Sequence, residues 1–291
     1  MPRLNIDSLP PAKAQYRRDV KAAIETPPAA RAEDGLRARG LSRPSVQASG
    51  LIDADKCAAL SDVLLAASIG KVITPSLASA VYLRRQRIKL ASSLWQFVDE
   101  CPLPATTFTL VSKDWQVAAD GLDVTDPNKP LNGLRSDLNR QGAGSAEGAI
   151  FMVVDGEFEP NRKIYPLHVH GVAVGVEMVR CIDSLRGLAK YRRVEASAAV
   201  AGIKRPVRIG REPLQYLPHP LTYLLKSYWP CRWAPVDEEQ PKERRKRRIP
   251  EPYHSQLLLW LDQWRLSDMT LMMGMYVGAT GFALSPRKTA E

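Results

Sequence analysis

The chain contains few cysteines and no long apolar run. Its four cysteines are far apart and form no Cys-x-x-Cys pair; they are Cys57, Cys101, Cys181 and Cys231. This spacing supplies neither a disulfide framework nor a thiolate zinc site, so we expect reduced and mostly buried thiols. No stretch approaches the roughly 20 apolar residues that span a bilayer, and no apolar signal segment stands at the first residues. The sequence therefore predicts a cytoplasmic protein without a membrane partner.

Acidic residues are outnumbered by basic ones. The 291 residues include 41 Lys and Arg against 31 Asp and Glu, which gives a formal net charge of +10. Such an excess favours polyanionic partners such as nucleic acid, although charge alone does not choose between DNA, RNA and an acidic membrane surface. The hydrophobic fraction of 45% supports a sizeable core, either in one large domain with appendages or in two small domains.

Composition divides the chain into five segments. Residues 1–50 are rich in Pro, Ala and Arg and show almost no apolar periodicity, which predicts a disordered basic arm. Residues 51–101 show helical periodicity, and Asp55 can cap the first of two helices there. The other segments are a core over 102–235, a basic linker over 236–250 and a helical tail over 251–291. In the tail, Ser267 and Asp268 are expected to begin the second of two helices.

Within the core, β-branched runs alternate with amphipathic stretches. The runs predict strands over 106–111, 149–154, 165–174 and 206–209, and the amphipathic stretches predict helices over 131–140 and 177–188. The order strand, helix, strand, strand, helix, strand is typical of a ferredoxin-like α+β layer with an antiparallel sheet and flanking helices. We expect helical N-terminal and C-terminal additions to this core.

Two of the four histidines lie two residues apart in the run Tyr165-Pro-Leu-His-Val-His-Gly-Val-Ala-Val174. Because side chains alternate along a strand, His168 and His170 project from the same face. Two imidazoles on one face can bind a single cation. A carboxylate-bearing strand precedes the pair and a Tyr-x-x-Lys segment follows it, and both strengthen the interpretation as a metal site.

Three segments resemble, in the same order, the motifs of HUH endonucleases, specifically of rolling-circle replication initiators with one tyrosine. They are Phe108-Thr-Leu-Val-Ser, Leu167-His-Val-His-Gly171 and Leu221-Thr-Tyr-Leu-Leu-Lys-Ser227. The resemblance covers roughly residues 105 to 230 and implies an HUH nuclease-like core. It further implies an enzyme that nicks and joins single-stranded DNA at a replication origin through a 5′-phosphotyrosyl intermediate. Such an enzyme initiates rolling-circle replication of a bacterial plasmid or related mobile element. This function is compatible with a host helicase as a partner and with an oligomeric state of the protein.

The resemblance also implies a divalent cation, Mg²⁺ or Mn²⁺, held by His168, His170 and a polar residue of the neighbouring strand. Asp155 and Glu157 both lie on one face of the preceding strand if that strand is regular. The turn that follows is long for the family, which leaves the pairing register open. We expect Glu157 rather than Asp155, because a shorter hairpin places it nearer His168. A solvated hairpin tip is the alternative for either carboxylate.

By the same resemblance, Tyr223 is the nucleophile that attacks phosphorus. Lys226 lies three residues further on, where a helix would place it on the same face and its ammonium could favour the phenolate or the charge that develops at phosphorus. Tyr216 and Tyr228 are competing candidates. A structural tyrosine is the alternative for each of the three.

Basic residues cluster between positions 242 and 248. The six are Lys242, Arg244, Arg245, Lys246, Arg247 and Arg248. Their mutual repulsion keeps the segment extended until an anion neutralises it, and we expect a contact with the DNA backbone rather than a merely charged linker. A second group belongs to the second helix of 51–101 and either faces phosphates or forms a solvated face; it comprises Arg84, Arg85, Arg87 and Lys89.

Other function classes remain open. The chain could be a non-catalytic DNA-binding protein with the same fold, or a metal-dependent hydrolase that activates water instead of a tyrosine. A related transposase would use similar tyrosine chemistry. His219 lies between two prolines, and we expect a loop histidine without a role rather than a contact with DNA near the nucleophile. His254 has no metal partner in its local sequence and is interpreted as structural.

Overall fold

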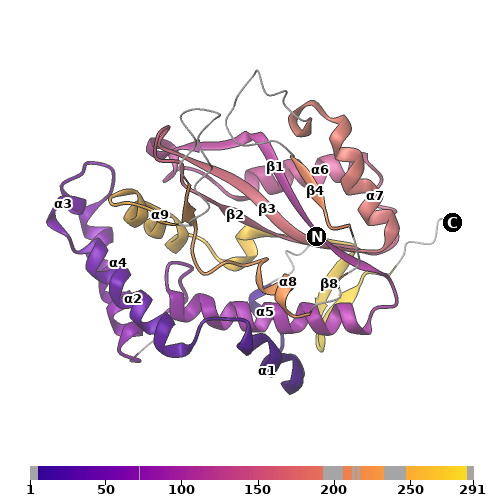
Figure 1. Cartoon of the computed structure of the whole chain (residues 1–291), viewed down its shortest axis with the longest axis horizontal. Coiled ribbons are helices and arrows are strands. Elements are labelled where there is room, and N and C mark those ends of the chain that lie inside the picture. Colours follow the sequence, from indigo (N-terminus) through magenta and orange to yellow (C-terminus); the bar gives the residue numbers. More distant parts are fainter. Residues whose placement is uncertain are drawn as a thin grey trace.

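A computed structural model describes residues 6–71, 73–192, 206–211, 214, 217–232 and 247–286. Its centre is a five-stranded antiparallel sheet with the spatial order β4-β1-β3-β2-β7 (Figure 1). The strands of this sheet are β1 (Ala105–Ala118), β2 (Ala149–Gly156), β3 (Ile164–Val174), β4 (Val207–Ile209) and β7 (Thr270–Met273). The expected α+β class with an antiparallel sheet is confirmed.

The remaining elements surround this sheet. The helices are α1 (Ala14–Ala22), α2 (Pro27–Leu41), α3 (Pro44–Gln47), α4 (Ala54–Ser68), α5 (Ala80–Glu100), α6 (Asn128–Arg140), α7 (Val176–Ser184), α8 (His219–Thr222) and α9 (Tyr253–Asp262). Single 3-10 turns are η1 (Ile6–Ser8), η2 (Ala119–Gly121), η3 (Leu185–Gly187), η4 (Ala189–Tyr191) and η5 (Leu266–Met269). Two small two-stranded sheets pair β5 (Pro230–Cys231) with β6 (Arg247–Arg248), and β8 (Met275–Gly278) with β9 (Gly281–Leu284). In the part of the chain described, no helix is long and apolar enough to cross a membrane.

The four strands and two helices expected in the core are present, in the order β1, α6, β2, β3, α7, β4. Strand β2 is buried along its whole length, because β3 and β7 cover its two edges and other elements cover both of its faces. Its run of apolar and β-branched residues suits such a position. The central strand β3 pairs with both β1 and β2, so a side chain on β3 has neighbours on two strands.

Helix α5 runs beneath the sheet, and α7 lies on the other side (Figure 1). Phe282 of β9 packs against Phe97 of α5 and Phe151 of β2, with ring centroids 6.4 and 5.6 Å apart. Phe151 shares its face of β2 with Val153 and Asp155, since alternate residues of a strand point to the same side. The face of the sheet that carries Asp155 is therefore the one that α5 covers.

The N-terminal residues do not form the expected disordered arm. Helices α1 and α2 pack on the rest of the protein, and Val20 and Leu41 are completely buried. The carboxylate of Asp34, also completely buried, accepts hydrogen bonds from the Ser79 hydroxyl and from the backbone N–H groups of Ala80 and Val81, at the start of α5. Long-range contacts of this kind stabilise an Ala- and Arg-rich stretch whose own pattern is weakly apolar, which explains why composition misled the prediction.

The C-terminal tail is helical only in part. Helix α9 is present, but the second expected helix is replaced by η5 and strand β7, followed by the β8–β9 hairpin. In β7, Leu271 and Met272 pair with Met152 and Phe151 of β2. Without β7, this edge of β2 would carry unpaired backbone N–H and C=O groups. The hydrogen bonds between β7 and β2 therefore outweigh the preference for a helix that the spacing of the methionines indicates.

Candidate metal and nucleophile site

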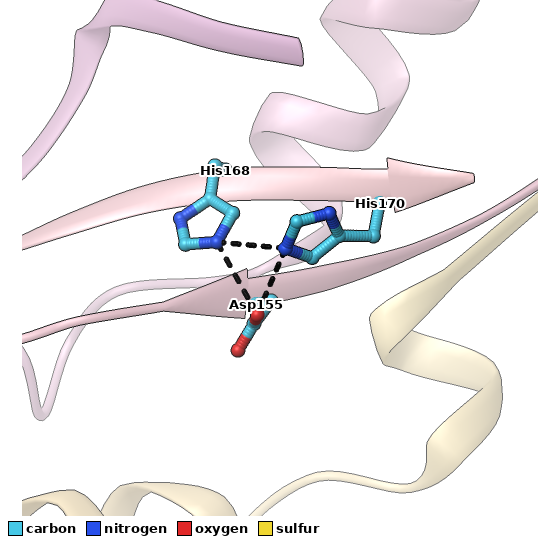
Figure 2. A group of neighbouring side chains, drawn as sticks. All are labelled: Asp155, His168 and His170. Carbon is cyan, nitrogen blue, oxygen red and sulfur yellow. Dashed lines mark hydrogen bonds and ion pairs between the residues drawn. The ribbon is translucent and has the colours of Figure 1, made fainter. Parts of the chain in front are cut away.

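The central strand positions the histidine pair. In the register of the sheet, His168 lies opposite Asp155 of β2 and Val111 of β1, and His170 lies opposite Val153 and Thr109. Residues directly opposite on neighbouring strands share a face, so both imidazoles and the Asp155 carboxylate project together. Figure 2 shows the three side chains converging between β2 and β3.

The position after His170 has no room for a side chain, and Gly171 occupies it. It lies opposite Phe108 of β1, and a Cβ at this position would stand 2.3 Å from the Phe108 ring. The ring therefore packs directly on the backbone of β3, on the face away from the histidines. This contact holds the central strand against its neighbour at the position next to His170.

The three donor atoms form a nearly equilateral triangle. The Asp155 Oδ2 atom is 3.2 Å from Nε2 of His168 and 3.2 Å from Nε2 of His170, and the two Nε2 atoms are 3.1 Å apart (Figure 2). Neighbouring ligands of an octahedral cation at about 2.1 Å lie about 3 Å from one another. The triad Asp155–His168–His170 thus has the composition and the spacing of a group that holds one metal ion.

The electrostatics suit a cation. Asp155 is 2% exposed, and its Oδ1 atom has no hydrogen-bond partner among the described residues. Burial by itself raises the pKa of Asp155, but His168, His170 and Lys226 outweigh it and hold that pKa well below the usual 3.8. The carboxylate is therefore ionised at neutral pH, and a buried ionised group needs a positive partner.

His170 is uncharged at neutral pH. Its Nδ1 atom lies 2.9 Å from Oγ1 of Thr109, and burial lowers the pKa of His170 below the usual 6.5 despite the opposing effect of the Asp155 carboxylate. If Nδ1 donates to the threonine oxygen, Nε2 keeps its lone pair and faces the centre of the triad. Thr109 was not singled out by sequence reasoning, although it belongs to the first of the three motifs.

Lys226 reaches the same carboxylate. Its ammonium contacts Oδ2 of Asp155, the oxygen that both histidines face. The lysine side chain is 16% exposed and the aspartate side chain 3%, so this ion pair is largely shielded from water. The structure thus brings Lys226 into contact with the triad, whereas the sequence predicted only a place beside Tyr223.

The expectation that Glu157 is the third ligand is wrong. Glu157 forms an ion pair with Arg232, with Oε2 and Nε 2.5 Å apart, and it is not part of the triad. The longer hairpin places Asp155, not Glu157, opposite His168. Beyond Asp155, the Trp229 ring packs against Gly156, where a Cβ would stand 2.4 Å from it, and β2 ends.

Tyr223 shares a surface depression with Lys226, but it does not lie on the expected helix. Helix α8 ends at Thr222, and Tyr223 is its C-terminal cap, so a shared helical face with Lys226 does not exist. The Tyr223 side chain is half exposed, and its ring lies 5.4 Å from that of His219. Tyr223, Lys226 and Tyr228 all line one surface depression with about 560 Å³ of empty space. The competing Tyr216 lies outside the described residues.

Two buried arginines hold the backbone of this segment. Arg87 of α5 donates to the carbonyl oxygens of Leu225 at 2.7 Å and Thr222 at 3.4 Å, and it also pairs with Glu25. Arg37 of α2 donates to Ser227 O at 2.9 Å. Neither the phosphate-facing nor the solvated interpretation of the basic group on α5 describes Arg87, which is 9% exposed. Sequence reasoning missed Arg37 because it assigned residues 1–50 to a disordered arm.

The other candidate residues lie elsewhere. Lys242, Arg244, Arg245 and Lys246 lie outside the described residues, while Arg247 and Arg248 form β6, and Arg248 pairs with Glu33. His254 is buried beside Glu251, 3.5 Å away, and does not belong to the triad. Comparisons with protein-family models, with curated proteins and with solved structures gave no match.

Proposed function

We propose that the protein is an HUH endonuclease that nicks and rejoins single-stranded DNA, with Tyr223 as nucleophile. The observation that carries the proposal is the convergence of Asp155, His168 and His170 within contact of Lys226, next to a depression lined by Tyr223. The arrangement of the core supports it as well. The element order β1-α6-β2-β3-α7-β4 and the spatial order β4-β1-β3-β2 agree with a ferredoxin-like layer that carries the two histidines on a central strand.

In this proposal, Asp155 and the Nε2 atoms of His168 and His170 hold a Mg²⁺ or Mn²⁺ ion. When bound, the ion supplies Lewis-acid polarisation of the scissile phosphate. The phenolic oxygen of Tyr223 forms a bond to phosphorus while the bond from phosphorus to the 3′-oxygen breaks. One phosphodiester replaces another, so the energy of the broken bond is kept for rejoining, and the freed 3′-hydroxyl can prime synthesis. The phenol proton passes to solvent water, and the leaving 3′-oxygen takes up a proton from water, so the transfer is balanced in protons.

Electrostatics outside the triad serve the same chemistry. Lys226 lines the depression that Tyr223 also lines, and once its ammonium leaves Asp155 it can stabilise a phenolate or the charge that develops at phosphorus. The basic run from Lys242 to Arg248 supplies contacts with the phosphates of the single-stranded DNA. The biological step proposed is initiation of rolling-circle replication of a plasmid or related element; a transposase would use the same transfer.

The decisive experiment looks for protein-linked DNA. Incubation of the protein with a library of single-stranded oligonucleotides and Mn²⁺ is expected to give a species that carries DNA through a 5′-phosphotyrosine. Tyr223→Phe should lose this adduct and keep its affinity for DNA, because the phenyl ring retains the packing and lacks only the nucleophilic oxygen. Tyr228→Phe is the matched control, since Tyr228 lines the same depression. An adduct that survives in Tyr223→Phe and disappears in Tyr228→Phe would identify Tyr228 as the nucleophile. If no strand gives an adduct, a non-catalytic DNA-binding protein becomes the better account.

A further inference from the structure

The centre of the triad already faces a positive charge. Three donors that would attract a cation converge there, and the Lys226 ammonium contacts one of them, Oδ2 of Asp155. That oxygen is the only atom of the carboxylate that faces the histidines, at 3.2 Å from each Nε2. Lys226 thus supplies, from the chain itself, the charge that neutralises Asp155.

A divalent ion and the ammonium compete for this oxygen. An ion held by Oδ2 and the two Nε2 atoms would lie next to Nζ of Lys226, and like charges at such separations repel strongly where water is scarce. Asp155 is almost completely buried and Lys226 largely so, and solvent screening is correspondingly weak. Full binding of the ion therefore requires that the ammonium leave Oδ2.

The surroundings allow the side chain to move while its backbone stays. Arg87 holds the carbonyl groups of Thr222 and Leu225, and Arg37 holds that of Ser227, so the backbone on both sides of Lys226 is fixed. The lysine side chain itself has four flexible methylene groups. Lys226 lines both the cavity that reaches Asp155 and the depression that contains Tyr223. A rotation of the side chain transfers its charge from one to the other.

We propose that Lys226 is an internal counter-ion of the triad, and that binding of a divalent ion displaces its ammonium from Asp155 towards Tyr223. The first half of this proposal concerns only the metal-binding triad. The second half rests on the proposed function, because it is the nucleophile that would receive the displaced charge. Metal loading and activation of Tyr223 would then be one event, since the ammonium reaches the phenol only after the ion has taken its place.

The first test measures metal affinity without DNA. Titration with Mn²⁺ at pH 7.5, followed by electron paramagnetic resonance of the free ion, compares the wild type with Lys226→Met and Lys226→Arg. Removal of the competing charge should tighten binding in Lys226→Met by about tenfold, within the usual range of coupling between two sites, and Lys226→Arg should stay near the wild type. Lys190→Met is the matched control, because Lys190 pairs with the buried carboxylate of Asp137 at 2.5 Å, outside the triad.

Weaker or unchanged Mn²⁺ binding in Lys226→Met would overturn the proposal: the lysine would then support Asp155 or be irrelevant to the ion. Binding that persists in the double variant His168→Ala, His170→Ala would show that the measured ion lies elsewhere, and would also overturn it. Neither result depends on nicking, so failure of the proposed function, seen as absence of the DNA adduct, is a separate outcome.

The second test uses the wild type and does not depend on a variant that folds. Acetylation of lysines by an N-hydroxysuccinimide ester is quantified by mass spectrometry with and without saturating Mg²⁺. The rate at Lys226 relative to Lys190 should rise severalfold when the ion is present, because the displaced ammonium is no longer held against Asp155. A rate at Lys226 that falls or stays constant would contradict displacement.

Discussion

At the scale of single residues, two carboxylates only two positions apart have different roles. Asp155 faces both histidines, whereas Glu157 pairs with Arg232 in a partly exposed position. Alternation along a strand places both carboxylates on one face. The sequence therefore indicates both as candidates for the third ligand but does not show which of them lies opposite His168. The ranking depends on the hairpin register, which is set by contacts such as that of Trp229 with Gly156.

This difference gives a matched pair of variants. Asp155→Asn should weaken Mn²⁺ binding by at least about tenfold, because it removes the charged ligand, while Glu157→Gln should leave the affinity unchanged. The measurement is the Mn²⁺ titration described above, with circular dichroism to verify that both variants are folded. Equal losses in the two variants would mean that the register of β2 and β3 does not determine the ligand.

At the scale of elements, the strands could be predicted better than the segment that carries Tyr223 and Lys226. Strands β1 to β4 and helices α6 and α7 follow from β-branched runs and amphipathic periodicity. Helix α8 is a single turn, and the residues after it owe their conformation to Arg87 and Arg37, which lie far away in the sequence. Local pattern contains no information about such contacts.

Arg87 should therefore control the order of the segment from Thr222 to Ser227. Arg87→Met removes two hydrogen bonds to backbone carbonyls and leaves Glu25 without its partner, at an expected cost of about 3 kcal/mol in the free energy of unfolding. Amide hydrogen exchange in residues 222–227 should rise above that of the wild type. Arg85→Met, on the exposed side of the same helix, is the control and should change neither quantity. Unaltered exchange in Arg87→Met would show that the segment is held by other contacts.

At the scale of the whole molecule, the N-terminal helices and the segment from Thr222 to Ser227 form one structure. Arg37 of α2 joins the carbonyls of Ala78 and Ser227, and Asp34 of the same helix caps α5. Helix α5 in turn covers the face of the sheet that carries the triad, through Phe97 and its neighbour Phe282. The pattern of residues 1–50 predicted a disordered basic arm because the groups that α1 and α2 contact are distant in sequence, and composition reports only local tendencies.

A truncated chain that begins at residue 51 tests whether the N-terminal helices stabilise the fold or form a disordered arm. Loss of Asp34 alone removes three hydrogen bonds to a buried carboxylate, and loss of Arg37 removes the hydrogen bonds to the carbonyl groups of Ala78 and Ser227. At about 1 kcal/mol or more for each, the truncated chain should lose over about 4 kcal/mol and unfold at clearly lower urea concentrations. The point variant Asp34→Asn keeps the shape of the side chain and weakens the same bonds, so it should show a smaller shift in the same direction. If the truncated chain has the same urea midpoint as the full chain, residues 1–50 do not stabilise the fold and the prediction of a disordered arm was correct. Helix α2 would then not support the segment that carries Tyr223 and Lys226.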